Sequence, residues 1–132
     1  MAIEPVRYLT FAEAVTLHIM LMRRLGETSF GVFDRTLVES ALGRPRNAAD
    51  LEGADIIRQA ATLCFGLIKN HPWVGGNKRT ATVLVDRFLH LNRMELRTTV
   101  SETVKMVLAV EGDRWSVDEI NDWYRQRVSP AE

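Results

Sequence analysis

Residues 70–81 read Asn-His-Pro-Trp-Val-Gly-Gly-Asn-Lys-Arg-Thr-Ala, and they separate two segments whose apolar residues repeat with helical spacing. The first segment runs from about Ala54 to Lys69, and the second runs from Asn77 to about Asn92. A turn that contains two glycines joins them and leads directly into the second segment. The stretch therefore predicts two central helices connected by a tight turn.

Capping signals predict the other helices of the chain. A serine or threonine followed three residues later by a glutamate is typical of a helix start, and it occurs at Thr10, Thr99 and Ser116. The helix that begins at Thr10 is expected to end before Gly26. Those that begin at Thr99 and Ser116 are expected to cover about 100–111 and 117–128. Alternating β-branched runs bounded by hairpin turns are almost absent. The predicted fold class is all-α.

A shorter helix is expected after Asp34, which can cap its first turn. Gly43 and Pro45 are expected to stop this helix. The tail over 129–132 is expected to be frayed. Because no repeat, linker or low-complexity segment divides the chain, residues 1–132 are expected to form a single domain.

The composition limits the function. The chain has 132 residues, of which 46% are hydrophobic and 26% charged, which is typical of one folded domain. It has 17 basic and 17 acidic residues, no helix with a basic stripe, and no apolar stretch long enough to span a bilayer. We therefore expect a cytoplasmic protein without direct DNA or membrane partners. Cys64 is alone, so it is expected to pack in the core.

The turn over 75–79 has the features of an anion site. The N–H groups at a helix start lack internal partners and lie at the positive end of the helix dipole, and glycines allow an anion to approach closely. Lys78 and Arg79 add charge. Moreover, no acidic residue lies between Asp55 and Asp86, which predicts a positive local potential. An ordinary turn between helices is the alternative.

Two residues of the turn have further candidate roles. His71 lies six residues before Asn77, where it could take a proton from a hydroxyl that attacks a bound phosphate. A structural histidine is the alternative. His18 and His90 lie inside helical patterns and are expected to be structural or exposed. Trp73 is expected to anchor the turn in the core, with substrate stacking as the alternative.

Outside the turn, Arg44 and Arg46 flank Pro45. They could meet phosphate or a partner protein, and a solvated turn is the competing interpretation.

The stretch 71–81 resembles the Fic/Doc signature, in which His-Pro and an aromatic residue are followed by an acidic residue, Gly-Asn and a basic pair. The ending Asn-Lys-Arg is similar to the Doc branch, the death-on-curing toxins of toxin–antitoxin modules. Fic enzymes usually continue as Gly-Asn-Gly-Arg with a second arginine, whereas this chain has Lys78 and Thr82. Residues 34–45 and 115–120 also look Doc-like.

The resemblance implies a compact bundle of about six helices and a set of site residues. His71, Lys78 and Arg79 would be catalytic, with His71 as the general base and the two cations stabilising the transferred charge. Gly75, Gly76 and Asn77 would cradle the nucleotide phosphates together with these cations. The cofactors would be ATP and Mg²⁺.

The resemblance also implies partners. A Doc-like toxin phosphorylates a hydroxyl of elongation factor Tu and arrests translation, and a Phd-like antitoxin would restrain it. The chain has no inhibitory Ser/Thr-x-x-x-Glu-Gly/Asn helix of its own. Any restraint is therefore expected from a separate protein.

Gly75 departs from the family pattern, which has Asp or Glu at this position to hold magnesium. Glycine offers only a backbone carbonyl, so the sequence predicts no metal-binding side chain in the motif and an impaired phosphotransferase. Two alternatives stay open. One is a Fic-type enzyme that transfers AMP, and the other is a catalytically silent module that binds an antitoxin or a nucleotide.

Overall fold

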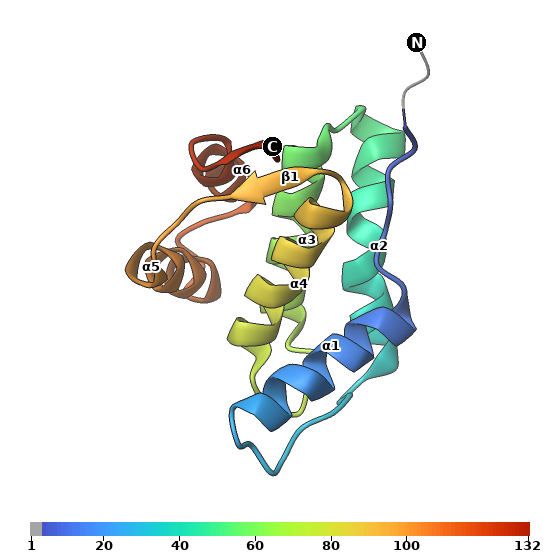
Figure 1. Cartoon of the computed structure of the whole chain (residues 1–132), viewed down its shortest axis with the longest axis vertical. Helices are drawn as coiled ribbons and strands as arrows, with labels where there is room; N and C mark the ends of the chain where they lie inside the picture. Colours follow the sequence, from blue (N-terminus) through green and yellow to red (C-terminus); the bar gives the residue numbers. More distant parts are fainter. Residues whose placement is uncertain (1–3) are drawn as a thin grey trace.

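The computed structural model describes residues 4–132. The elements in chain order are α1 (Phe11–Arg24), α2 (Arg35–Glu52), α3 (Ile56–Asn70), α4 (Asn77–Leu91), β1 (Met94–Leu96), α5 (Val100–Glu111), α6 (Val117–Arg125) and β2 (Val128–Pro130). Six helices and one two-stranded sheet make up the regular structure of the described residues (Figure 1). The all-α prediction is confirmed, and none of these helices is long and apolar enough to cross a membrane.

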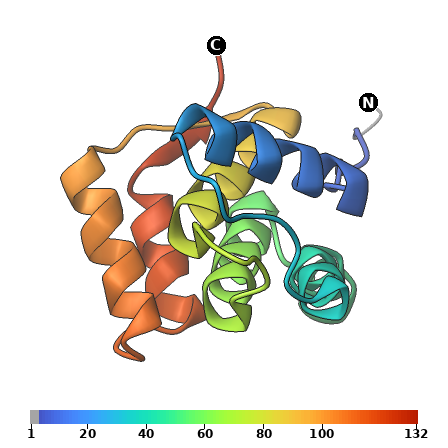
Figure 2. The same ribbon diagram turned by 90° about the horizontal axis from the view of Figure 1, so that it is seen from below.

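Helix α3 is the centre of the bundle because most of its surface is apolar. It packs against α2, α4, α5 and α6, while α1 crosses one end of the bundle (Figures 1 and 2). Cys64 is buried in this helix, as expected. The side chain of Arg44 in α2 packs against the backbone of α3 at Gly66. A Cβ atom at Gly66 would lie 2.6 Å from Cδ of Arg44. The absence of a side chain at Gly66 thus leaves room for the Arg44 side chain between α2 and α3.

Local capping explains why most helix starts were predictable. Thr10 and Glu13 form a complete capping box at α1, and Thr99 accepts the Glu102 N–H at α5. The Oδ1 atom of Asp34 accepts the Leu37 N–H (3.2 Å), which begins α2. Each cap satisfies a backbone donor that the helix cannot satisfy itself.

The predicted end of α2 was wrong, because the helix continues through Gly43 and Pro45 to Glu52. Pro45 lacks an N–H for the carbonyl four residues earlier, but it is buried on the same stripe as Val38, Ala41 and Ala48. The packing of this stripe outweighs the lost hydrogen bond. The helix ends instead at Gly53, whose φ of 65° is left-handed.

The longer α2 also changes the surroundings of its arginines. Arg44 lies over the ring of Phe65 (5.4 Å) and Arg46 over the ring of Tyr8 (4.7 Å). Such cation–π contacts place both side chains on the helix surface. The solvated-turn interpretation was therefore wrong, since no turn exists there.

The C-terminal tail is paired rather than frayed. Strand β2 lies antiparallel to β1, with Met94 opposite Pro130 and Leu96 opposite Val128. The Ala131 N–H also donates to the carbonyl of Arg93 (2.9 Å). The expectation of a frayed tail was wrong because pairing with a distant segment supplies its hydrogen bonds.

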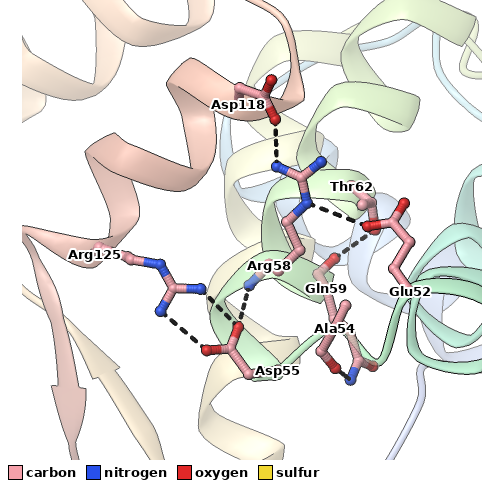
Figure 3. Close-up of polar contacts among 8 residues, drawn as sticks. All are labelled: Glu52, Ala54, Asp55, Arg58, Gln59, Thr62, Asp118 and Arg125. Atoms are coloured by element: carbon pink, nitrogen blue, oxygen red, sulfur yellow. Dashed lines mark hydrogen bonds and ion pairs between the residues drawn. The ribbon is translucent and has the colours of Figure 1, made fainter.

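Ion pairs tie α6 to the start of α3 (Figure 3). Asp55 caps α3 by accepting the Arg58 N–H, and both its carboxylate oxygens accept from Arg125 of α6 at 2.9 Å. Arg58 in turn lies between Glu52 (3.6 Å) and Asp118 (2.7 Å). The hydrogen bond from Arg125 holds the pKa of Asp55 below its usual value. Asp55 therefore combines a helix cap with an interhelical ion pair.

We expect Asp55→Ala to lower the free energy of unfolding by about 1–2 kcal/mol, mainly through the lost cap. Asp55→Asn should lower it by only about 0.5 kcal/mol, because asparagine still caps and the ion pair is largely solvated, with the Asp55 side chain 55% exposed. Since the pKa of Asp55 is depressed, the ion-pair contribution is present above pH 3.8 and is lost as the pH falls below that value. Urea unfolding checks this order, and equal losses for the two variants would contradict it.

Candidate functional site

The turn between α3 and α4 is paired with the connection between α1 and α2. His71 ends α3 with a left-handed φ of 49°, and Val32 then forms an antiparallel bridge with Trp73. The Phe33 N–H donates to the carbonyl of Pro72 (2.9 Å), and the Val74 N–H donates to that of Gly31 (2.9 Å). Both connections lie at the lower end of Figure 1. The turn is thus held by backbone hydrogen bonds from a distant segment.

Asn77 holds the turn from inside. Its Oδ1 atom accepts the Trp73 N–H (2.9 Å), and its Nδ2 atom donates to the Trp73 carbonyl (3.0 Å). No side chain caps α4, whose first backbone hydrogen bond of the regular pattern runs from Thr80 to Gly76 (2.8 Å). The helix therefore presents backbone N–H groups at its start, while the Asn77 side chain fixes the shape of the turn.

The two glycines of the turn have different requirements. Gly76 has a left-handed φ of 65°, and a Cβ atom there would lie 2.3 Å from Cε of the buried Met22. Gly75 has an ordinary φ, and its Cβ atom would lie 3.2 Å from the carbonyl oxygen of Ser29. A side chain at position 75 would thus require a shift of only a few tenths of an ångström. The absence of an acid there is not imposed by the backbone.

His71 has the tautomer that a general base needs. Its Nδ1 atom lies 3.1 Å from the carbonyl oxygen of Ile68. A carbonyl only accepts hydrogen bonds, so Nδ1 carries the proton and the lone pair is on Nε2. The side chain is exposed, so a hydroxyl can reach it.

His18 is fully buried beneath the turn. Its Nε2 atom accepts the Gly31 N–H (3.0 Å), so Nδ1 carries the proton and donates to Oγ1 of Thr80 (2.9 Å). The ring stacks on Trp73, with 4.3 Å between centroids, and burial lowers the pKa of His18. The expectation that His18 and His90 are structural or exposed is confirmed, since His18 is buried and His90 is exposed. Sequence reasoning missed how His18 joins the parts of the site, since its spacing gives no such signal.

Trp73 is only 2% exposed. Its predicted role as the anchor of the turn is confirmed. Because its ring is buried and stacks on His18, Trp73 has no exposed face on which a substrate could stack.

The cations of the turn are partly paired. Nζ of Lys78 lies 3.0 and 3.3 Å from the two carboxylate oxygens of Glu111 in α5. Lys69 pairs with Asp113, but Arg79 makes no ion pair within residues 4–132. Acidic residues from α5 and from the connection after it thus pair with lysines of the interval between Asp55 and Asp86, which has no acid of its own in sequence.

Two neighbouring cavities meet at the start of α4 and share Lys78 and Arg79. The smaller, of about 360 Å³, is lined by Met22, Leu25, Glu27, His71, Gly76, Asn77, Lys78 and Arg79. The larger, of about 500 Å³, lies between α4 and α5 and is lined mostly by threonine, valine and leucine. The structure therefore brings the predicted site residues together around the smaller cavity, except for Gly75. Within the described residues, no three His, Cys, Asp or Glu side chains are grouped to hold a metal ion.

The chain is similar to known proteins over the part that contains the turn. Residues 8–89 match the model of the Fic/DOC family, a range that contains α1, α2, α3 and most of α4. The chain is also similar to the Toxin Doc of Mycolicibacterium smegmatis, with 38% identity over 79 residues. This match covers 54% of the chain and 59% of the relative. The similarity therefore spans little more than half of either protein.

We expect Gly76→Ala to lower the free energy of unfolding by about 1–2 kcal/mol, because alanine is strained at a left-handed φ. Gly75→Ala is the matched control and should lower it by less than about 1 kcal/mol, since its backbone is ordinary and only one contact is tight. Urea unfolding of the two variants measures the difference. A larger loss for Gly75→Ala would contradict the geometry of the turn.

We expect His18 to make stability depend on pH. Because its pKa in the folded protein is below the usual 6.5, the unfolded state binds the proton first. The contribution of His18 is therefore present above pH 6.5 and is lost as the pH falls toward the lower folded pKa. His18→Gln should flatten this part of the profile, because its Oε1 atom accepts the Gly31 N–H without titrating. Chemical unfolding between about pH 7.5 and 5.5 tests this, and a slope that His18→Gln leaves unchanged would contradict it.

Proposed function

We propose, from the fact that this chain belongs to the Fic/DOC family, that it is a Doc-like toxin that transfers a phosphate from ATP to a protein hydroxyl. Elongation factor Tu is the target that we propose to test first. The observation that supports this most is one cavity lined by His71, Gly76, Lys78 and Arg79, in which His71 uses Nδ1 for the Ile68 carbonyl and so keeps its lone pair on Nε2.

The residues of this cavity suit phosphoryl transfer. Nε2 of His71 would take the proton of the attacking hydroxyl as its oxygen bonds to the γ-phosphorus. The bond from that phosphorus to the bridging oxygen breaks, and ADP leaves. Backbone N–H groups at the start of α4 would hold the phosphoryl oxygens, and Arg79 would balance their charge. Lys78 would contribute after exchanging the carboxylate of Glu111 for phosphate.

The larger cavity suits the nucleoside part of the same ligand. It adjoins the smaller one at Lys78 and Arg79, and its other lining residues are threonines and aliphatic side chains. A nucleotide has a charged end and a less polar end, so two joined cavities of this character fit it better than one.

The partner that we propose is a Phd-like antitoxin. Val100, Val104 and Leu108 of α5 are exposed apolar side chains, and all three line the larger cavity. They are spaced four residues apart, so they form one stripe on the helix. An antitoxin segment that covers this stripe would close the nucleotide cavity at the same time.

Magnesium supplies charge neutralisation on nucleotide phosphates when it is bound. The motif does not fit it at Gly75, where a side-chain ligand is lacking. We therefore propose that this chain is slower than a variant with an acid at that position. The same position is the observation that favours the second candidate, a catalytically silent module that binds nucleotide or antitoxin.

The test incubates purified elongation factor Tu and Mg-ATP with three proteins: the chain itself, Gly75→Asp, and Gly75→Asp with His71→Ala. We expect a phosphate-sized mass gain on the target, fastest with Gly75→Asp. Loss of the base should slow the reaction by roughly 10²–10⁴-fold. Intact mass spectrometry of the target follows the reaction.

A mass gain the size of AMP would reject the kinase and establish the Fic-type reaction. The absence of any gain with all three proteins would reject phosphorylation of this target and favour either another target or the silent module. A gain that survives His71→Ala unchanged would remove His71 from the mechanism.

A further inference from the structure

The ammonium group of Lys78 is already paired with a carboxylate of the protein. Its Nζ atom lies 3.0 and 3.3 Å from the two carboxylate oxygens of Glu111, so both oxygens take part in one forked contact. Lys78 lines both cavities at the start of α4, whereas Glu111 comes from the end of α5, outside the motif over 71–81. The cation that the proposed reaction needs is therefore not free in the empty site.

The backbone at Glu111 is held independently of this pair. Nζ of Lys69 in α3 lies 3.5 Å from the carbonyl oxygen of Glu111, and it also pairs with the carboxylate of Asp113. These contacts join the end of α5 to the central helix of the bundle. The side chain of Glu111 thus begins at a position that the fold defines, within reach of Lys78.

The pair is weak enough to be exchanged. The side chains of Lys78 and Glu111 are 47% and 34% exposed, and water screens ion pairs of this kind. A terminal phosphate group carries more negative charge than a carboxylate and offers three oxygens as acceptors. A phosphate at the start of α4 can therefore take the ammonium group from Glu111, but it has to compete for it.

The neighbouring cation, Arg79, is not occupied in this way. It also lines both cavities, and it makes no ion pair within residues 4–132. A phosphate that enters would thus meet one cation that is available at once and one that is available only by exchange. The difference between them is the carboxylate of Glu111, which therefore affects how tightly the phosphate is held.

We propose that Glu111 is an intramolecular competitor of phosphate at Lys78. In the empty site its carboxylate holds the ammonium group, so it lowers the affinity for a nucleotide, and it pairs with Lys78 again when the nucleotide leaves. This inference rests on the nucleotide site of the proposed function. It assigns to the end of α5 a role in setting affinity that the motif over 71–81 does not contain.

The experiment measures the affinity for ATP by titration calorimetry at an ionic strength of about 0.15 M, where salt weakens the effect of distant charges. The proteins are the full chain, Glu111→Gln and Asp113→Asn. Asp113→Asn is the matched control, because it removes the charge of a nearby carboxylate that pairs with Lys69 instead of Lys78. We expect Glu111→Gln to bind ATP about fivefold more tightly and Asp113→Asn to change the affinity by less than about twofold. Urea unfolding checks that both variants are folded.

The direction of the change decides the outcome. If Glu111→Gln binds ATP as tightly as the unchanged chain or less tightly, the pair only joins α5 to α4, and the inference is overturned while the nucleotide site stands. Equal tightening by Asp113→Asn would also overturn it, because a general loss of negative charge would then explain the effect. If ATP binds to none of the three proteins, the nucleotide site of the proposed function is overturned together with the inference.

Discussion

The imidazole of His18 is the contact on which the rest of the site depends. One neutral ring accepts the Gly31 N–H, donates to Thr80 and stacks on Trp73, so it joins the α1–α2 connection, α4 and the turn. Each of these groups is buried or tied to the backbone, and a lost partner would leave a polar atom unsatisfied. The ring therefore links the turn that carries the candidate site to the rigid core of the bundle.

Much of the fold could be predicted because helix starts are local. Thr10, Asp34 and Thr99 lie next to the N–H groups that they cap, so a few residues contain the information. Pro45 misled the prediction because its effect depends on burial against α3, which no local pattern shows. The pairing of β1 with β2 was missed for a similar reason, since three residues are too few to display an alternating pattern.

The candidate site also contains residues that could be predicted from local sequence and residues that could not. The motif identified His71, Gly76, Lys78 and Arg79, which share one cavity because they are close in sequence around a tight turn. His18, Glu27 and Glu111 were missed as site residues because they arrive from other elements. In sequence they differ in no way from the chain's other histidines and acids. The carboxylates that pair with Arg58, Lys69 and Lys78 were missed for the same reason, since they approach these cations only in the folded protein.

The ion pair between Lys78 and Glu111 gives the unliganded protein an internal counter-ion. An anion that engages Lys78 competes with this carboxylate for the N–H donors of the ammonium group, so the pair weakens when the anion binds. Glu111 is the last residue of α5, and its release would remove a tether between that helix and α4. Binding of an anion at the start of α4 is thereby coupled to the mobility of the C-terminal end of α5. The mobility of this helix end would therefore indicate whether the site is occupied.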